Sequence, residues 1–169
     1  VFFLDEMDAS IPEVLVLLNA AIANGYFEFP NGRVTLKHVH FVAAGNTVGS
    51  GADEMYTGRM VIDQATLDRF TIINFDYDIR IELSITKNNI DLVDFIHQLR
   101  EYATTQGIRA TFSYRCMTMV TKLEKAGMDL VKIMQIAVMK GLDKDTINTF
   151  YLTGESKYHK ALRKVQQAA

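Results

Sequence analysis

Short apolar runs that end in polar residues characterise the first half of the chain. Residues 1–4 lead directly into two carboxylates, Asp5 and Glu6, and residues 40–46 form a second run that ends at Asn46. A third run covers residues 71–76. Continuous apolar runs of this length are typical of parallel strands that are covered on both faces. The pattern therefore predicts three buried strands of an α/β sheet.

Between the first two runs, the sequence predicts a helix and a β-hairpin. The helix has Pro12 in its first turn, Ser10 or Asp8 as its cap, and a stop signal at Asn24-Gly25. Two alternating runs, residues 26–29 and 33–36, then flank an Asn-Gly turn, which is typical of a hairpin.

Two less regular segments follow in this half. Residues 47–64 are rich in Gly, Ser, Asp and Met, and they predict a loop with a short helix. Residues 79–86 are rich in isoleucine and predict a short extended stretch.

From Asn88 onward, apolar residues recur with a period of about 3.6, which indicates helices. The predicted domain boundary therefore lies near Lys87, with an α/β part at 1–87 and a helical part at 88–169. Glycine stops and aspartate caps divide the helical part. The predicted helices cover residues 90–107, 112–126, 129–141 (capped by Asp129), 143–151 (capped by Asp143) and 158–167.

Composition and charge narrow the function classes. Cys116 is the only cysteine, which excludes an intrachain disulfide and favours a reducing cytoplasm. No apolar run reaches the roughly 18 residues that a membrane span needs. The net charge of −2 divides into 6 basic against 12 acidic residues at 1–87, and 12 against 8 at 88–169. This division suits docking modules or head-to-tail subunits, and the pI of about 6.1 disfavours nucleic-acid binding.

The carboxylates after the first strand indicate a site for phosphate chemistry. Ligands of open α/β sheets bind beyond the carboxyl ends of the strands. Adjacent residues of a strand point to opposite faces, so Asp5 and Glu6 cannot share one role. One of them can hold a metal ion while the other handles a water molecule, which is the division that nucleotide hydrolysis at a Mg²⁺–phosphate centre needs.

Three motifs occur in a fixed order: the Asp5-Glu6 strand, the Asn46 strand, and residues 65–70 (Ala-Thr-Leu-Asp-Arg-Phe) before the third run. This order resembles the second half of an AAA+ ATPase core, most closely the MoxR-like and dynein-related branch, over roughly residues 1–125. The resemblance implies a partial P-loop NTPase sheet with a β-hairpin, followed by a helical lid, and it implies ATP and Mg²⁺ as cofactors. The hairpin at 26–36 resembles the pre-sensor hairpin of this branch, or it is a surface hairpin that helps to pack the sheet.

The resemblance also implies roles for single residues. Asp5 matches the Walker B position that holds Mg²⁺, and Glu6 matches the residue that orients the attacking water; the alternative is that both cap the following helix. Asn46 matches the sensor-1 amide that contacts the γ-phosphate or the lytic water, and alternatively lies in a simple Gly-Asn turn.

Two arginines are assigned in the same way. Arg69 matches an arginine finger presented to a neighbouring subunit, or it forms a local ion pair with Asp68. Arg115 resembles sensor 2, which contacts the nucleotide, although Tyr114 stands where the family has a small residue or proline; the alternative is a surface arginine.

Several other residues are weaker candidates. Arg59 either reaches across a subunit interface or forms a structural ion pair. His38 and His40 lie two residues apart on a strand, which favours a half-exposed strand edge over a metal site. The methionines of the helical part are expected in its core, and the basic residues of the last helix on a solvated face. These residues are Met117, Met119, Met128, Met134 and Met139, and Lys157, Lys160, Arg163 and Lys164.

The phosphate-binding motif G-x-x-x-x-G-K-[ST] is absent from the sequence. We therefore expect a fragment of a larger ATPase that is itself inactive. Its parent is expected to form a ring, most simply a hexamer, and to remodel a protein partner. Two alternatives remain open: a nucleic-acid motor or restriction-type NTPase with Arg33 at the hairpin tip as its contact, and a non-hydrolysing interaction module.

Overall fold

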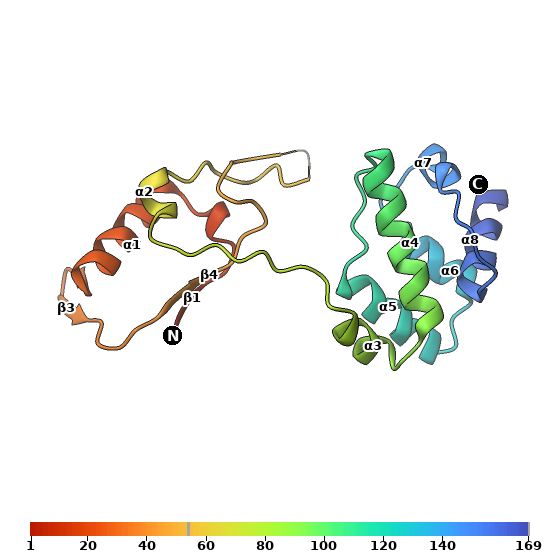
Figure 1. The fold of residues 1–169 in the computed structure, drawn as a ribbon, viewed down its shortest axis with the longest axis horizontal. Coiled ribbons are helices and arrows are strands. Elements are labelled where there is room, and N and C mark those ends of the chain that lie inside the picture. Colours follow the sequence, from red (N-terminus) through yellow and green to blue (C-terminus); the bar gives the residue numbers. More distant parts are fainter. Residues whose placement is uncertain (54, 169) are drawn as a thin grey trace. The chain divides into compact units, whose positions relative to one another are not determined.

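The computed structural model describes residues 1–53 and 55–168, which divide into two compact units, Val1–Asn74 and Phe75–Ala169 (Figure 1). The first unit combines short helices with two small sheets, and the second is helical, so the chain is a mixed α/β protein. The boundary predicted near Lys87 lies inside the second unit, between two of its helices. Among the described residues, no helix is both long enough and apolar enough to cross a membrane.

The first two predicted strands are confirmed, and they pair with each other. Strand β1 (Phe2–Leu4) runs parallel to β4 (Phe41–Ala43), with Phe2 opposite Phe41 and Leu4 opposite Ala43. The prediction that they are buried on both faces is wrong, because Phe3 on β1 is exposed. Within the described residues this sheet has only these two strands, and exposed side chains on both of them, such as Phe2 and Val42, show that its faces are incompletely covered.

The third predicted strand is wrong, and so is the extended stretch after it. Residues 71–78 form a loop without regular structure, in which Phe75 is 89% exposed. Helix α3 (Ile79–Thr86) replaces the extended stretch, and the Asp78 carboxylate caps it by accepting a hydrogen bond from the Arg80 backbone N–H. The β-branched residues suggested a strand, but the cap and the packing of the helix override that propensity.

The hairpin is confirmed, with its turn one residue earlier than predicted. Strands β2 (Tyr26–Phe29) and β3 (Gly32–Thr35) pair antiparallel and close at Phe29 opposite Gly32, which leaves Pro30 and Asn31 as the loop. Gly32 has a φ of 135°, a backbone conformation that residues other than glycine rarely adopt.

Helix α1 (Pro12–Asn24) is confirmed, but its predicted cap is wrong. Ile11 is the residue at the cap position, and no side chain caps this helix. Asp8 lies in the short 3₁₀ turn η1 (Met7–Ala9), where its carboxylate binds other partners. Gly25 ends the helix in the left-handed conformation, as predicted. The small core of this unit centres on Met7, Leu15 and Ile62.

The described residues of the connection, 47–53 and 55–63, form a loop, as predicted, and an isolated bridge joins Ser50 to Val61. The loop leads into helix α2 (Gln64–Leu67), where the Asp63 carboxylate accepts a hydrogen bond from the Thr66 backbone N–H.

The predicted helices of the second unit are confirmed, and Asp129 and Asp143 both cap helices as expected. The segment that begins at Asp129 is split, because a short α-helix continues as a π-helix. The observed elements are α4 (Ile90–Gln106), α5 (Tyr114–Lys125), α6 (Leu130–Ile133), the π-helix η2 (Met134–Val138), α7 (Lys144–Thr149) and α8 (Lys157–Ala168).

Helix α4 supplies much of the core of this unit and packs against α3, α5 and α8 (Figure 1). Its residues Leu92, Phe95, Ile96 and Leu99 are completely buried. The expectation for the methionines holds in part. Three of them are buried in this core and two are exposed: Met117, Met134 and Met139 are buried, and Met119 and Met128 are exposed.

Candidate functional site

The ends of β1 and β4 meet at one edge of the parallel sheet. Asp5 and Glu6 follow β1, and Gly45 and Asn46 follow β4. Two backbone hydrogen bonds join the segments beyond the strands: the Ala44 N–H donates to the Leu4 carbonyl at 2.9 Å, and the Met7 N–H donates to the Ala44 carbonyl at 2.8 Å. The strand-end carboxylates and Asn46 therefore lie at the same edge of the sheet.

Asp8 organises this edge, although the sequence analysis considered it only as a helix cap. Its side chain is 1% exposed. One carboxylate oxygen, Oδ2, accepts hydrogen bonds from the Asn46 N–H at 3.0 Å, the Thr47 N–H at 2.8 Å and the Thr47 hydroxyl at 2.9 Å. Gly45 passes close by, since a Cβ there would lie 3.1 Å from the Asp8 carboxyl carbon.

The ionised form of Asp8 is favoured by its surroundings. Burial raises the pKa of the Asp8 carboxyl, but hydrogen bonds from Thr47 and Asn46 lower it, and so does the positive charge of Arg59. The lowering influences prevail, so the pKa lies below its usual value of 3.8. Asp8 is therefore an ionised, buried anchor for the turn that carries Asn46.

Arg59 bridges two carboxylates at this edge. Its Nη1 atom lies 3.5 Å from Asp8 Oδ1 and 3.5 Å from Glu6 Oε2, and its side chain is only 11% exposed. The Met60 N–H donates to the Asp8 carbonyl at 2.8 Å, which ties the Arg59 loop to η1. Of the two roles considered for Arg59, the structural ion pair is therefore the one observed.

Asp5 and Glu6 are accessible to ligands. Asp5 is exposed, and its Oδ1 atom accepts a hydrogen bond from the Glu6 N–H at 3.1 Å. Glu6 has a left-handed backbone (φ 52°, ψ 43°), and its side chain is 63% exposed. Neither carboxylate caps α1, whose cap position is Ile11, so the alternative role as caps of that helix is wrong.

Asn46 and Arg69 lie in the same unit, both exposed. Asn46 contributes its backbone N–H to the Asp8 carboxylate, which keeps the turn in place while its amide side chain is exposed. The Arg69 guanidinium, just beyond the end of helix α2, donates to the carbonyl of Ala65 on that helix. The local ion pair with Asp68 is not among the contacts of the described residues.

The helical unit contains Arg115 and a second polar network. Arg115 is exposed on α5. Its neighbour Tyr114 has a structural role, because its hydroxyl accepts a hydrogen bond from the Asp78 N–H. Arg115 belongs to the second unit, whereas Asp5, Glu6, Asn46 and Arg69 belong to the first.

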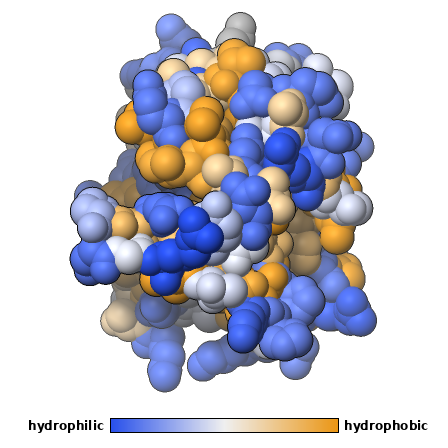
Figure 2. All heavy atoms as spheres, turned by 90° about the vertical axis from the view of Figure 1, so that its left-hand side faces the viewer, coloured by the Kyte–Doolittle hydropathy of each residue, from blue (hydrophilic) through white to orange (hydrophobic). Residues whose placement is uncertain are grey.

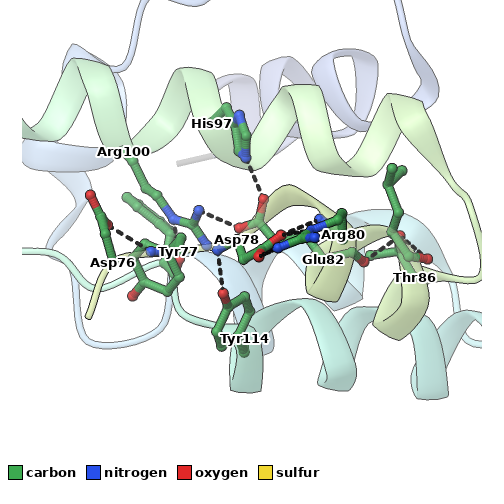
Figure 3. A network of polar contacts seen from close by, with 11 residues as sticks. Asp76, Tyr77, Asp78, Arg80, Glu82, Thr86, His97, Arg100 and Tyr114 are labelled. Carbon is green, nitrogen blue, oxygen red and sulfur yellow. Dashed lines mark hydrogen bonds and ion pairs between the residues drawn. The ribbon is translucent and has the colours of Figure 1, made fainter.

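Glu82 lies at the centre of the second network (Figure 3). Its side chain has no exposed surface, and its two oxygens contact His97 Nε2 and Arg100 Nη1. Arg100 also donates from Nε to the Phe112 carbonyl at 2.6 Å, and its guanidinium lies over the Tyr77 ring at 3.6 Å. This network joins α3 to α4 and to the loop before α5.

Sequence reasoning missed Asp8, Arg59 as its partner, and Glu82. Asp8 gave no distinct signal, because an aspartate shortly before a helix is normally read as a cap. Glu82 did give one: a carboxylate within an isoleucine-rich stretch needs a cationic partner if the stretch is buried.

The weaker candidates have ordinary roles. Among the described residues, no group of three or more His, Cys, Asp or Glu side chains is placed to hold a metal ion. The prediction that His38 and His40 lie on a strand is wrong, because His38 is in a turn with a φ of 57° and His40 directly precedes β4; both residues are exposed. In α8, Lys157 pairs with Glu124, and Arg163 pairs with Glu155. At the hairpin, Arg33 pairs with Glu28 at 3.0 Å and lies over the Tyr26 ring.

No family model, curated protein or solved structure matches this chain.

Proposed function

We propose that this chain is the part of an ATP-hydrolysing AAA+ module, of the MoxR-like and dynein-related kind, that contains the catalytic strand ends and the helical lid. The observation that carries the proposal is the parallel pairing of β1 with β4, because it brings Asp5, Glu6 and Asn46 to one edge of the sheet. Ligands of α/β sheets bind at this edge.

The residues at the edge suit Mg²⁺ and a nucleotide. Mg²⁺ is usually bound by one or two carboxylates together with water and substrate phosphates, so the single exposed carboxylate of Asp5 is a sufficient protein ligand. The bound ion would neutralise charge on the phosphates. The exposed Glu6 carboxylate can accept a proton from a water molecule and orient it, and the Asn46 amide can donate to a phosphate oxygen.

The phosphate cradle would have to come from outside this sequence, since no Gly-rich G-x-x-x-x-G-K-[ST] loop occurs within it. In this proposal Arg69 contacts the nucleotide of a neighbouring subunit. The Arg69 side chain is exposed, and among the described contacts its hydrogen bond is to a backbone carbonyl. It can therefore reach a second molecule without breaking an ion pair among those contacts. A ring of subunits follows from this assignment, and by resemblance to the family we propose that the ring remodels a protein partner.

The test is ATP turnover by the full-length gene product, wild type beside Glu6→Gln. Because Glu6 is proposed to act as the base for water, we expect turnover to fall by about 10²–10⁴-fold while ATP binding is kept. Glu13→Gln is the matched control, since Glu13 is an exposed glutamate on α1 that lies outside the site, and it should turn over ATP like the wild type. A wild-type protein that neither binds nor hydrolyses ATP would refute the proposal.

A second candidate is a non-hydrolysing interaction module, which is favoured by the exposed apolar side chains of the first unit. Apolar surface is visible among the polar groups in Figure 2. Exposed apolar residues of β1 and α1 include Phe2, Phe3, Val14, Val16 and Leu17. Figure 2 shows hydrophobic side chains gathered on part of this face, and contiguous apolar surface often marks an interaction site. The same turnover experiment separates the two candidates, because an interaction module would bind its partner without hydrolysing ATP.

A further inference from the structure

The Arg59 guanidinium makes two contacts of different kinds. The contact with Asp8 is buried, since the Asp8 side chain is almost completely shielded from solvent, whereas the Glu6 side chain is largely exposed. A buried ion pair is costly to break, while an exposed one contributes little and exchanges easily. Asp8 therefore fixes the position of the Arg59 guanidinium, which offers the exposed Glu6 carboxylate a stationary partner.

The anchor itself is immobilised by the end of β4. Asp8 Oδ2 already accepts three hydrogen bonds from Asn46 and Thr47. Its other oxygen, Oδ1, is buried, receives no hydrogen bond among the described residues, and has Arg59 as its charged neighbour. The position of Arg59 is thus set by the same turn that presents Asn46.

Glu6 needs such a partner if it handles a water molecule. Its backbone is in the left-handed region, which is uncommon for residues other than glycine, and its side chain extends into solvent. An exposed glutamate samples several rotamers, whereas a general base must stay within hydrogen-bond reach of its water. Arg59 is the cation that contacts the Glu6 carboxylate among the described residues.

We infer that Arg59 is a positioning residue, which holds the Glu6 carboxylate in register with Asn46 through the buried anchor Asp8. The inference rests on the proposed ATPase function and adds a residue to it. An arginine suits this role because its planar guanidinium stays charged and offers several N–H donors in fixed directions. Lysine would keep the charge but supply it from a single flexible ammonium group.

The experiment measures kcat and KM for ATP with saturating Mg²⁺ in the full-length gene product. For Arg59→Met we expect kcat to fall about 10- to 100-fold, as for other residues that orient a catalytic group. The KM should stay within about threefold of the wild type, because the variant leaves nucleotide contacts in place. Arg59→Lys should recover part of kcat. Asp8→Asn, which weakens the anchor but keeps Arg59 and Glu6, should lower kcat in the same direction.

The control for lost stability is Ile62→Ala, which removes a buried side chain from the core of the same unit without touching the ion pairs. It should destabilise the protein while kcat per folded molecule is unchanged. The inference is overturned if Arg59→Met keeps the wild-type kcat, or if Ile62→Ala lowers kcat as much as Arg59→Met does. Absence of turnover in the wild type itself would instead refute the proposed ATPase function, and this inference with it.

Discussion

Replacement of the buried Glu82 by glutamine tests how the helical unit is held together. The substitution keeps the size of the side chain but removes its charge, which leaves the Arg100 guanidinium without its anionic partner. Removal of one partner from a buried ion pair costs about 3–5 kcal/mol. Hydrogen bonds to charged groups, which Glu82 accepts from Arg100 and His97, contribute about 1.5–3 kcal/mol each.

Two features reduce the expected loss toward the lower end of this range. Arg100 keeps its hydrogen bond to the Phe112 carbonyl and its contact with the Tyr77 ring. His97 is 44% exposed, so water can replace the carboxylate there. We therefore expect Glu82→Gln to lower the free energy of unfolding by about 3 kcal/mol.

The assay is chemical denaturation followed by far-UV circular dichroism, which reports mainly on the helices. Glu101→Gln is the matched control, because Glu101 is exposed and lies on α4, the helix that carries both partners of Glu82. Surface substitutions usually change stability by less than about 0.5 kcal/mol, so the control should unfold like the wild type. If Glu82→Gln lowers the free energy of unfolding by less than about 1 kcal/mol, the charge of Glu82 contributes little to stability and the reasoning is refuted.

Three further substitutions test single contacts. A Cβ at Gly154 would overlap the His159 ring, so Gly154→Ala should destabilise the protein by about 1–3 kcal/mol, measured as a lower thermal midpoint. Burial, and after it the charge of Arg163, lowers the pKa of His159 below 6.5. As the pH falls, this histidine is therefore protonated in the unfolded protein before it is protonated in the folded protein. Stability should therefore decrease as the pH drops below about 6.5, and His159→Gln should weaken that decrease in urea titrations at several pH values. Asp143 accepts hydrogen bonds from the Thr146 N–H and hydroxyl at the start of α7, so Asp143→Ala should lower the urea midpoint, and an unchanged midpoint would contradict the cap.

The helical unit was predictable because its signals are local. Asp129 and Asp143 bind backbone N–H groups three residues ahead, and Gly107 ends α4 in the left-handed conformation. Such caps and stops act within one turn of the residue that supplies them, so the sequence around each helix end is sufficient. Only the split at Met134, where the helix changes to π-type, gave no local signal.

The segment at 71–86 was predicted wrongly because its structure depends on distant residues. A run of apolar and β-branched residues fits a strand only if a neighbouring strand is present, and none pairs with residues 71–78 in the structure. In α3, Glu82 and Thr86 lie one helical turn apart and are both buried. The partners of Glu82 are 15 and 18 residues away, on α4, so no local pattern could reveal them.

The candidate site, too, was predictable only where its signals are local in the sequence. The apolar runs that end in Asp5-Glu6 and in Asn46 were predicted as strands of one sheet, and the parallel pairing of β1 with β4 brings the ends of these strands together. The roles of Asp8 and Arg59 depend on contacts 38 to 53 residues apart in the chain, which neither composition nor periodicity reveals.

Hydrogen bonds and ion pairs determine the geometry of the strand ends in the first unit more than apolar packing does. Its parallel strands keep exposed apolar faces, and its core of fully buried side chains is small. Packing therefore constrains the strand ends less than it constrains α4, whose apolar face is completely buried. Hydrogen bonds and ion pairs are directional, so the Asp8 carboxylate can orient the Asn46 turn and Arg59 where packing does not. A substitution at Asp8 should consequently disturb the geometry of the strand ends more than an apolar substitution of equal cost in stability.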